Sequence, residues 1–232
     1  MPEKQEQAKH GSRQREAPEP GEQTAHAFDK GYWERHWDQS SPAAHGTRSA
    51  PPNPYLLAET RNLPPGSALD AGCGTGSEAI WLALQGWHVT GADISGNALA
   101  LAAKAAREAA IADRVSWIET DLTTWSPQDR WDLVVTSYAH PGEPQLAFYQ
   151  RISGWVAPAG SLLIVGHRAQ ASHGHGEQHP LEATATLAGI SALLSPTKWR
   201  IESAAEHRRT LPAANTQAVL HDVVVRATRL AR

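Results

Sequence analysis

The sequence predicts an α/β domain with a mostly parallel, seven-stranded sheet flanked by helices. From residue 67 to the end of the chain, short apolar segments typical of buried strands alternate with segments of helical periodicity. A glycine-rich turn at residues 72–76 follows the first of these strands, where an α/β sheet binds its ligands. The chain has 232 residues, of which 41% are hydrophobic, so one domain can bury a sizeable core.

The chain begins with a polar segment that we exclude from the fold. Residues 1–25 are charged and interrupted by proline and glycine, so we expect a disordered tail that cannot bury enough apolar surface to offset its chain entropy. The folded domain is expected to span residues 26–232. Its first segment predicts a short amphipathic helix, because its aromatic residues recur at spacings of about one helical turn. These residues are Phe28, Tyr32, Trp33 and Trp37.

Local signals place the remaining elements. Asn53-Pro54 combines an N-cap residue with a proline in the first turn of a helix, and Pro64-Pro65-Gly66 ends that helix. Ser95 is the expected cap of an alanine-rich helix. The predicted strands are 67–70, 88–93, 115–119, 131–138, 161–165, 199–203 and 219–227. The predicted helices between them are 53–62, 76–85, 95–110, 143–156 and 181–194, with Pro158-Ala159-Gly160 as the turn before the fifth strand.

Composition excludes several classes of protein. The 21 basic and 24 acidic residues give a formal net charge of −3, so the chain lacks the bulk positive charge that binds nucleic acids. Cys73 is the single cysteine, which excludes an internal disulfide and any chemistry that needs a thiol pair. No segment approaches the roughly 20 consecutive apolar residues of a membrane span, and the amino terminus has no apolar core of a secretory signal. We therefore expect a cytoplasmic protein with no membrane partner, either a monomer or a homodimer.

The spacing of the glycine turn separates two kinds of cofactor site. A dinucleotide site uses G-x-G-x-x-G, so that a helix amino terminus faces a pyrophosphate. Here the glycines are Gly72, Gly74 and Gly76, in a G-x-G-x-G pattern, and Asp70 stands two residues before the first. An acid at that position suits the ammonium and sulfonium end of S-adenosylmethionine. The turn therefore favours S-adenosylmethionine as the cofactor. An oxidoreductase is the alternative that this spacing disfavours, and tight binding of NADH would support it.

The segment Leu69-Asp70-Ala71-Gly72-Cys73-Gly74-Thr75-Gly76 resembles motif I of the class I, Rossmann-like S-adenosylmethionine-dependent methyltransferases. The resemblance spans about residues 55–225. It implies that the cofactor is bound by Asp70 and by the turn, including Gly72, Cys73, Gly74 and Gly76. We expect Cys73 to be a small buried residue of this turn rather than a nucleophile.

The resemblance continues downstream in the order that the family shows. It implies that Asp93, at the end of the second strand, accepts both ribose hydroxyls, and that Ile94 packs on the adenine. Asp121-Leu122 follows the third strand, where the family places an acid near the adenine amino group. Thr136, Ser137 and Tyr138 end the fourth strand, where the family lines the cleft for cofactor and substrate.

The aromatic segment near the amino terminus has two interpretations. In small-molecule methyltransferases resembling the thiopurine and tellurite-resistance groups, a similar segment covers the cofactor. The resemblance therefore implies a lid over about residues 28–50, in which Tyr32, Trp33 and Trp37 exclude water and contact the sulfonium or the substrate. A desolvated cation over aromatic faces gains about 1–2 kcal/mol. The alternative is a helix that packs its aromatic side chains on the sheet.

Two candidates for a catalytic role follow the fourth strand. His140 could act as a general base, because the pKa of imidazole lies near the operating pH, and Tyr138 is the other candidate. A simple role in the pocket wall is the alternative for His140. A second group of histidines follows the fifth strand. These histidines could belong to a solvated loop, line the wall of the substrate pocket or bind a metal, and we expect no metal. These residues are His167, His173, His175 and His179.

Taken together, these patterns predict a methyltransferase that uses S-adenosylmethionine and a small-molecule acceptor. In-line transfer from a sulfonium depends mainly on proximity and desolvation, and a soft nucleophile such as a thiolate needs no protein base. The chain leaves no room for a separate substrate domain. A methyltransferase of protein or RNA is an alternative, disfavoured by the charge and by the absence of an Asn-Pro-Pro-Tyr tetrapeptide. A non-catalytic module that binds S-adenosylmethionine is the second alternative.

Overall fold

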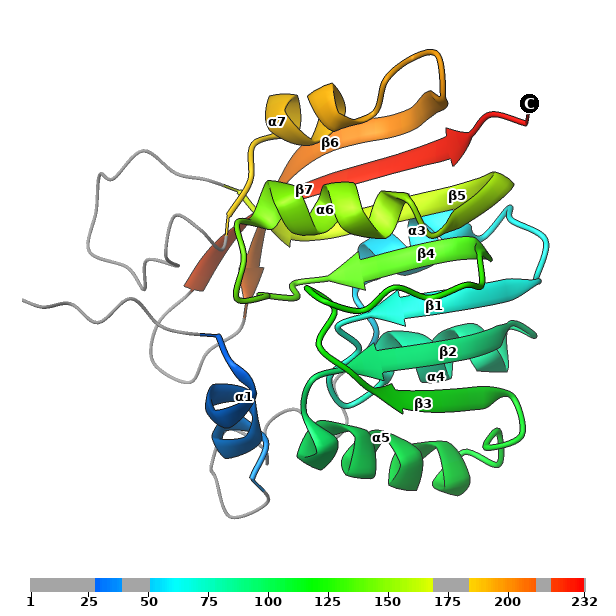
Figure 1. The fold of residues 1–232 in the computed structure, drawn as a ribbon, viewed down its shortest axis with the longest axis vertical. Coiled ribbons are helices and arrows are strands. Elements are labelled where there is room, and N and C mark those ends of the chain that lie inside the picture. The colour runs from blue at the N-terminus through cyan, green and yellow to red at the C-terminus, as the bar shows by residue number, and fades with distance from the viewer. Residues whose placement is uncertain (1–27, 39–50, 169–183, 212–217, 232) are drawn as a thin grey trace, which may run out of the picture.

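A seven-stranded sheet organises the part of the chain that the computed structural model describes, residues 28–38, 51–168, 184–211 and 218–231 (Figure 1). The strand order is β3-β2-β1-β4-β5-β7-β6. Strands β1 to β5 pair in parallel, and β7 is antiparallel to both of its neighbours. The strands are β1 (Ser67–Ala71), β2 (His88–Asp93), β3 (Val115–Glu119), β4 (Trp131–Ser137), β5 (Val156–His167), β6 (Trp199–Leu211) and β7 (Ala218–Arg229). The predicted fold class, a mostly parallel sheet of seven strands flanked by helices, is confirmed.

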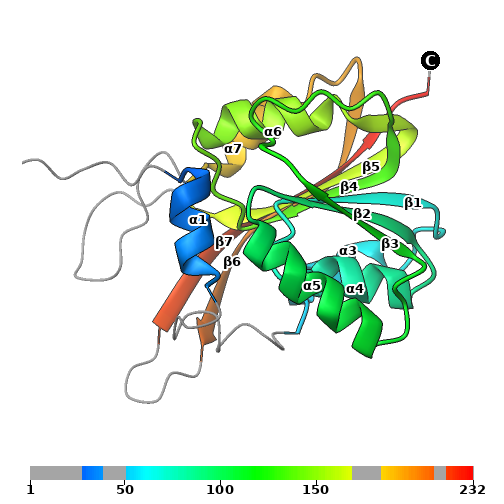
Figure 2. The same ribbon diagram turned by 60° about the horizontal axis from the view of Figure 1, so that its bottom comes forward.

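Helices cover both faces of this sheet (Figure 2). They are α1 (Lys30–His36), α3 (Pro54–Thr60), α4 (Ser77–Leu84), α5 (Gly96–Glu108), α6 (Gln145–Ser153) and α7 (Leu187–Leu193). Helices α3, α4 and α5 lie on one face, and α6 and α7 lie on the other. Among the described residues, no helix is long and apolar enough to cross a membrane.

The alternation of side chains along the strands divides the core into two clusters. In β1, Ala68 belongs to the cluster that also contains Leu56 of α3 and Leu82 of α4. Its neighbour Leu69 belongs to the cluster that contains Phe148 of α6 and Ile190 of α7. Successive strand residues point to opposite faces, so a strand buried on both faces is apolar throughout. The sheet is therefore held between two apolar layers, and polar groups collect at the strand ends.

Both predicted helix caps are confirmed. The Asn53 side chain accepts a hydrogen bond from the backbone N–H of Leu56 at 2.9 Å, at the start of α3. The Ser95 hydroxyl accepts one from the backbone N–H of Ala98 at 3.2 Å, at the start of α5. Each bond satisfies a backbone donor that the helix itself leaves unpaired.

The expected turn at Pro158-Ala159-Gly160 is wrong, because these residues lie inside β5. Trp131 of β4 pairs with Val156, and Leu133 pairs with Ser161, so the register shifts between these two pairs. The additional residues of β5 are accommodated as an irregularity of the ladder rather than as a connection. Strands β6 and β7 are also longer than predicted, and α7 begins later than predicted.

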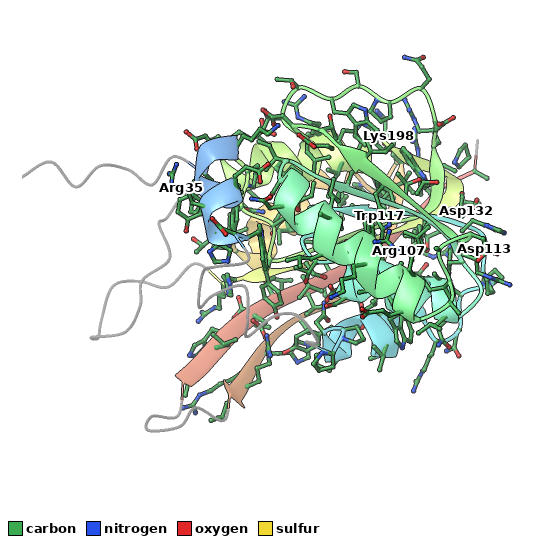
Figure 3. All side chains as sticks on the ribbon, turned by 90° about the horizontal axis from the view of Figure 1, so that it is seen from below. Arg35, Arg107, Asp113, Trp117, Asp132 and Lys198 are labelled. Carbon is green, nitrogen blue, oxygen red and sulfur yellow. The ribbon has the colours of Figure 1, made fainter. Side chains whose placement is uncertain are left out.

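Helix α1 lies beyond the carboxyl ends of the parallel strands, toward which the arrows of β1 to β4 point (Figure 1). Figure 3 shows Arg35 of α1 at one side of the molecule and Asp132, near the start of β4, at the opposite side. The predicted tail, residues 1–25, and residues 39–50 of the predicted lid lie outside the described residues. The described part of the lid therefore sits at the edge of the sheet where the sequence places the cofactor.

Candidate functional site

A cavity of about 810 Å³ opens at the carboxyl edge of the sheet, where β1 and β4 are neighbours. The chain leaves β1 toward β2 and leaves β4 toward β5, so this is the switch point at which open α/β sheets bind ligands. Segments that follow four strands line it, namely 72–75, 93–94, 119–123 and 137–142. Residues of the α1 segment cover the opposite side. The volume is in the upper part of the range for small-molecule sites, which run to about 1,000 Å³.

The glycines of the turn are required by backbone geometry and by close approach. Gly72 has φ 79°, and a Cβ placed on it would lie 2.4 Å from the Cβ of Ala139. A Cβ on Gly74 (φ 51°) would lie 3.4 Å from the Trp37 ring. Gly72, Cys73 and Gly74 line the cavity as expected. Burial raises the pKa of the Cys73 thiol, which favours the predicted role of a small buried residue over that of a nucleophile.

Asp93 is the last residue of β2 and connects the glycine turn to α5. Its Oδ2 accepts a hydrogen bond from the backbone N–H of Gly74 at 2.8 Å, and its Oδ1 accepts one from that of Ser95 at 2.9 Å. The side chain is buried, and burial raises its pKa, although these backbone bonds act against that increase. A carboxylate has about four lone-pair sites. Asp93 therefore keeps acceptor capacity for the ribose hydroxyls.

Other predicted cofactor contacts also lie on the cavity wall. Ile94 and the buried Leu122 provide apolar surface there. The Oδ1 of Asp121 accepts hydrogen bonds from the backbone N–H and the hydroxyl of Thr123, at 2.9 and 2.7 Å, which fix the orientation of its carboxylate. The Ser137 hydroxyl accepts a hydrogen bond from the amide Nδ2 of Asn53 at 2.8 Å. The ends of β2, β3 and β4 thus meet around one cavity.

Three predicted cofactor residues, Asp70, Gly76 and Tyr32, do not line the cavity. Asp70 is buried within β1, where its Oδ2 has no hydrogen-bond partner among the described residues. Burial raises the pKa of Asp70 well above its ordinary value, and the nearby carboxylates of Glu78 and Asp93 add to the effect. Gly76 instead begins α4, with Trp117 so close that a Cβ would meet the ring at 2.6 Å.

The lid residues divide between two roles. Trp33 and Trp37 line the cavity together with Phe28. Tyr32 packs against this group, with its ring centroid 5.5 Å from that of Phe28 and 5.0 Å from that of Trp33. No residue of α1 is fully buried, so the helix covers the cavity without joining the core of the sheet.

Glu34, which the sequence analysis missed, attaches α1 to the start of α5. Its carboxylate accepts hydrogen bonds from the backbone N–H groups of Gly96 at 2.9 Å and Asn97 at 3.1 Å, and from the Ser95 hydroxyl at 3.2 Å. A negative charge is stabilised at a helix amino terminus. Lys30 forms an ion pair with Glu119 at the end of β3. No local pattern could reveal these bonds, because the partners lie 61–63 residues (Glu34) and 89 residues (Lys30) away.

Both candidates for a catalytic role, Tyr138 and His140, line the cavity. The His140 ring lies 5.5 Å from Phe28 and stacks 5.5 Å from His167, which itself does not line the cavity. The Tyr138 hydroxyl accepts a hydrogen bond from Nη2 of Arg209 at 2.9 Å. Burial is the main cause that raises the pKa of Tyr138 above its ordinary value. The other three predicted histidines of this region, His173, His175 and His179, lie outside the described residues.

Most of the charged side chains of the cavity wall are acidic. Five carboxylates line it, those of Asp29, Glu78, Asp93, Glu119 and Asp121. Glu78 was not predicted; burial raises its pKa, and its Oε1 accepts a hydrogen bond from the Asn53 backbone N–H at 3.1 Å. Lys30 is the one lysine or arginine among the described residues of the wall, and it is paired with Glu119. This charge distribution, the glycine cradle and Asp93 fit a cofactor that carries a sulfonium, an ammonium group and a ribose.

Comparisons with known proteins agree with this geometry. Residues 68–160 match a family model described as a methyltransferase domain. The chain is 32% identical over 139 residues to a probable thiol methyltransferase 2 of Arabidopsis thaliana, covering 58% of this chain and 61% of that protein. It is 33% identical over 136 residues to a trans-aconitate 2-methyltransferase of Streptomyces avermitilis, covering 55% of this chain and 49% of that protein. It therefore spans about half to three-fifths of the length of these relatives.

A solved structure shows the same fold over nearly the whole chain. The magnesium protoporphyrin IX methyltransferase from Synechocystis PCC 6803, with bound S-adenosylmethionine, superimposes with a TM-score of 0.60 at 19% identity. The superposition covers 89% of this chain and 100% of that structure. The strand order, the glycine turn, Asp93 and the matched methyltransferase domain lead to the same assignment. Residues 68–160 match a methyltransferase domain, and the described sheet has the Rossmann-like fold of a methyltransferase that binds S-adenosylmethionine.

Proposed function

We propose that this protein transfers a methyl group from S-adenosylmethionine to the sulfur atom of a small, uncharged thiol. The observation that carries this proposal is that Lys30, the one lysine or arginine among the described residues of the cavity wall, is already paired with Glu119. A thiol methyltransferase and a trans-aconitate methyltransferase are both among its relatives. The charge of the wall is the property that separates the two kinds of acceptor.

An acceptor with several carboxylates would be poorly held in this cavity. Buried carboxylates need cationic or hydrogen-bonding partners to offset the loss of hydration, and arginine forks are the usual ones. Among the described residues, no arginine lines the cavity, and the Lys30 ammonium is taken by Glu119. An uncharged thiol makes no such demand. Sulfur also makes favourable contacts with aromatic rings, which Phe28, Trp33 and Trp37 offer.

The proposed reaction needs little from the protein beyond alignment and the exclusion of water. Bound S-adenosylmethionine supplies a methyl group on a positively charged sulfur. The thiol loses its proton, a new carbon–sulfur bond forms to its sulfur, and the sulfonium bond breaks, which gives a thioether, the demethylated cofactor and a proton. Free thiols have a pKa of about 8.5, so a fraction is thiolate near neutral pH. His140, on the cavity wall, is the proposed acceptor of the thiol proton.

A comparison of acceptors tests this proposal. The purified protein is incubated with S-adenosylmethionine and, separately, a small neutral thiol, a mercapto acid of the same size, trans-aconitate and a phenol, and the methylated products are quantified by mass spectrometry. We expect turnover of the neutral thiol to exceed that of the other three at least tenfold. Turnover of trans-aconitate above the thiol would contradict the proposal. Calorimetry with both forms of the cofactor, and with NADH as control, tests binding separately, and binding without any turnover would support a non-catalytic module.

A further inference from the structure

Four polar side chains, from three different elements and from the segment that follows β4, meet beside the cavity. Asp222 of β7 is fully buried, and its Oδ2 accepts hydrogen bonds from Nε of Arg209 at 2.7 Å and from the hydroxyl of Tyr55 at 3.0 Å. Nη2 of Arg209 donates in turn to the Tyr138 hydroxyl at 2.9 Å. Arg209 belongs to β6, Tyr55 to α3, and Tyr138 follows β4. The group therefore connects the carboxyl-terminal hairpin to the cavity wall.

The place of this group follows from the length of the hairpin. Strand β5 ends at His167, which is opposite Asp222 of β7, whereas the pairing of β6 with β7 continues to Leu211 and Ala218 (Figure 2). Arg209 lies in this extension, beyond the carboxyl end of β5. A shorter hairpin, as the sequence predicts, would end before Arg209 and would leave Tyr138 without this partner.

The ion pair between Arg209 and Asp222 contributes little net stability to the fold. Removal of the Asp222 carboxylate from water offsets much of the Coulomb energy that it gains from the partly exposed Arg209, and apolar residues of similar volume often stabilise a protein as well or better. The Oδ1 of Asp222 is buried with no hydrogen-bond partner among the described residues. Tyr138 also has φ 54°, a left-handed backbone that is unfavourable for a residue other than glycine. Backbone strain at a residue of a cavity wall, such as Tyr138, is typical of functional sites.

The bond from Arg209 fixes the position of Tyr138 and restrains its neighbours. The Arg209 guanidinium lies 5.6 Å from the centre of the Tyr138 ring, and the His167 ring lies 4.7 Å from it. His167 stacks on His140, and all residues of the segment 138–142 line the cavity. A displaced Tyr138 would therefore change both the start of this segment and the support of the His140 ring.

We propose that Arg209, held by Asp222, is a positioning residue that fixes Tyr138 and, through His167, the His140 ring at the acceptor side of the cavity. This proposal rests on the proposed methyl transfer only in its kinetic test, because that test measures turnover. Arg209 does not line the cavity and acts through Tyr138. Small displacements of aligned groups lower the reaction rate strongly, because proximity supplies much of the acceleration in this type of reaction.

The kinetic test compares Arg209→Met with Arg226→Met. Arg226 is the matched control, since it forms an ion pair from the same hairpin to Glu59 of α3 and does not contact the Tyr138 hydroxyl. We expect Arg209→Met to lower kcat for the acceptor roughly tenfold, while the Kd for S-adenosylmethionine stays within about twofold, and Arg226→Met to leave kcat unchanged. Adding Tyr138→Phe to Arg209→Met should lower kcat no further than either change alone, because both remove the same bond. Equal kcat values in the two methionine variants, or fully multiplicative effects, would overturn the proposal.

A second measurement does not depend on turnover. Tyrosine labelled with ¹³C at Cζ gives one resonance for each of the four tyrosines, and Tyr138→Phe identifies the one that belongs to Tyr138. We expect Arg209→Met to shift or broaden this resonance, Arg209→Lys to shift it less, and Arg226→Met to leave it in place. If no thiol is methylated, the proposed function fails and this spectrum still decides the role of Arg209. A Tyr138 resonance that is the same in wild type and Arg209→Met would overturn the proposal.

Discussion

At the residue scale, Asp93 combines a structural role with a proposed ligand-binding role, and substitutions can separate the two. Its two backbone hydrogen bonds hold the glycine turn and the start of α5, and its remaining lone pairs face the cavity. We expect Asp93→Ala to weaken S-adenosylmethionine binding by about 2–4 kcal/mol and also to lower Tm. Asp93→Asn keeps the size and one acceptor oxygen, so it should lower Tm less while still weakening binding. Calorimetry and thermal melts measure the two effects.

The matched control for this prediction is Asp113→Ala. Asp113 is exposed in the connection between α5 and β3, and Figure 3 shows it on the side of the molecule opposite Arg35 of α1. Removing this carboxylate should change neither binding nor Tm. Unaltered affinity for the cofactor in both Asp93 variants would show that the ribose contact is assigned to the wrong residue.

Residues of the site were predictable where one local pattern carries the chemistry. The glycine spacing and the acid at the end of β2 are readable because backbone geometry and ligand chemistry restrict those positions to few residue types. Asp70 shows the limit, since its sequence position suggests a cofactor contact and the structure buries it below the turn. Glu34, Glu78 and Arg209 gave no signal, because each acts through a partner that only the tertiary structure brings close.

At the element scale, helix α1 is held over the cavity by few bonds, so its attachment can be weakened without damage to the core. Glu34→Ala removes three acceptor contacts at the start of α5. We expect the affinity for S-adenosylmethionine to fall about threefold to thirtyfold, since only the fraction of molecules with α1 in place binds the cofactor fully. Tm should change little, because no residue of α1 is fully buried. Calorimetry measures the affinity, and hydrogen exchange of residues 28–38 reports the attachment of the helix.

Arg35→Ala provides the comparison for Glu34→Ala. Arg35 is the next residue of the same helix and is exposed, so its removal has a similar effect on helix propensity without touching α5. We expect wild-type affinity and wild-type exchange for this variant. If the two alanine variants behave alike, the bonds of Glu34 do not hold the lid.

The existence and order of the elements were predictable, whereas several of their lengths were not. Caps such as Asn53 and Ser95 and the periodicity of apolar residues are local signals, and they placed the helices and strands correctly. The length of β6 and β7 depends on how far the two strands pair with each other, which is a non-local property. The irregular start of β5 likewise depends on its register with β4. The length of β6 and β7 positions Arg209, so the part of the site that is proposed to face the acceptor was the least predictable.

At the scale of the whole molecule, the fold concentrates charge that the composition conceals. A net charge of −3 over 232 residues predicts no strong field, yet five carboxylates line one cavity and Asp70 lies buried beneath it. Parallel strands bring their carboxyl ends to one edge, so acids that are far apart in the sequence become neighbours. Burial raises the pKa of Asp70, Glu78 and Asp93, which means that the folded protein holds their protons more tightly than the unfolded chain does.

This difference in proton binding predicts how stability depends on pH. The ordinary pKa of an aspartate is 3.8, and the pKa of Asp70 in the folded protein is higher. At pH values between these two, the folded protein binds more protons than the unfolded chain. The free energy of unfolding therefore decreases as the pH rises through that interval. Asp70→Asn removes one of these groups, so the variant should lose less stability than the wild type as the pH rises above about 4.

Urea unfolding of the cofactor-free protein across this range measures the effect, with Asp113→Asn as the exposed control. Some groups have a lowered pKa in the folded protein, such as Glu202, which accepts hydrogen bonds from Thr228 and Arg200. These groups are the same in the wild type and in both asparagine variants, so their effect on stability cancels in the comparison. A wild-type pH profile in Asp70→Asn would mean that the buried carboxyl carries none of this dependence. A flatter profile in Asp70→Asn alone would show that the buried carboxyl of Asp70 lowers the stability of the cofactor-free protein as the pH rises. Binding of S-adenosylmethionine should then stabilise the wild type more as the pH rises, since burial raises the pKa of Glu78 and Asp93 on the cavity wall and these carboxyl groups gain charge with increasing pH.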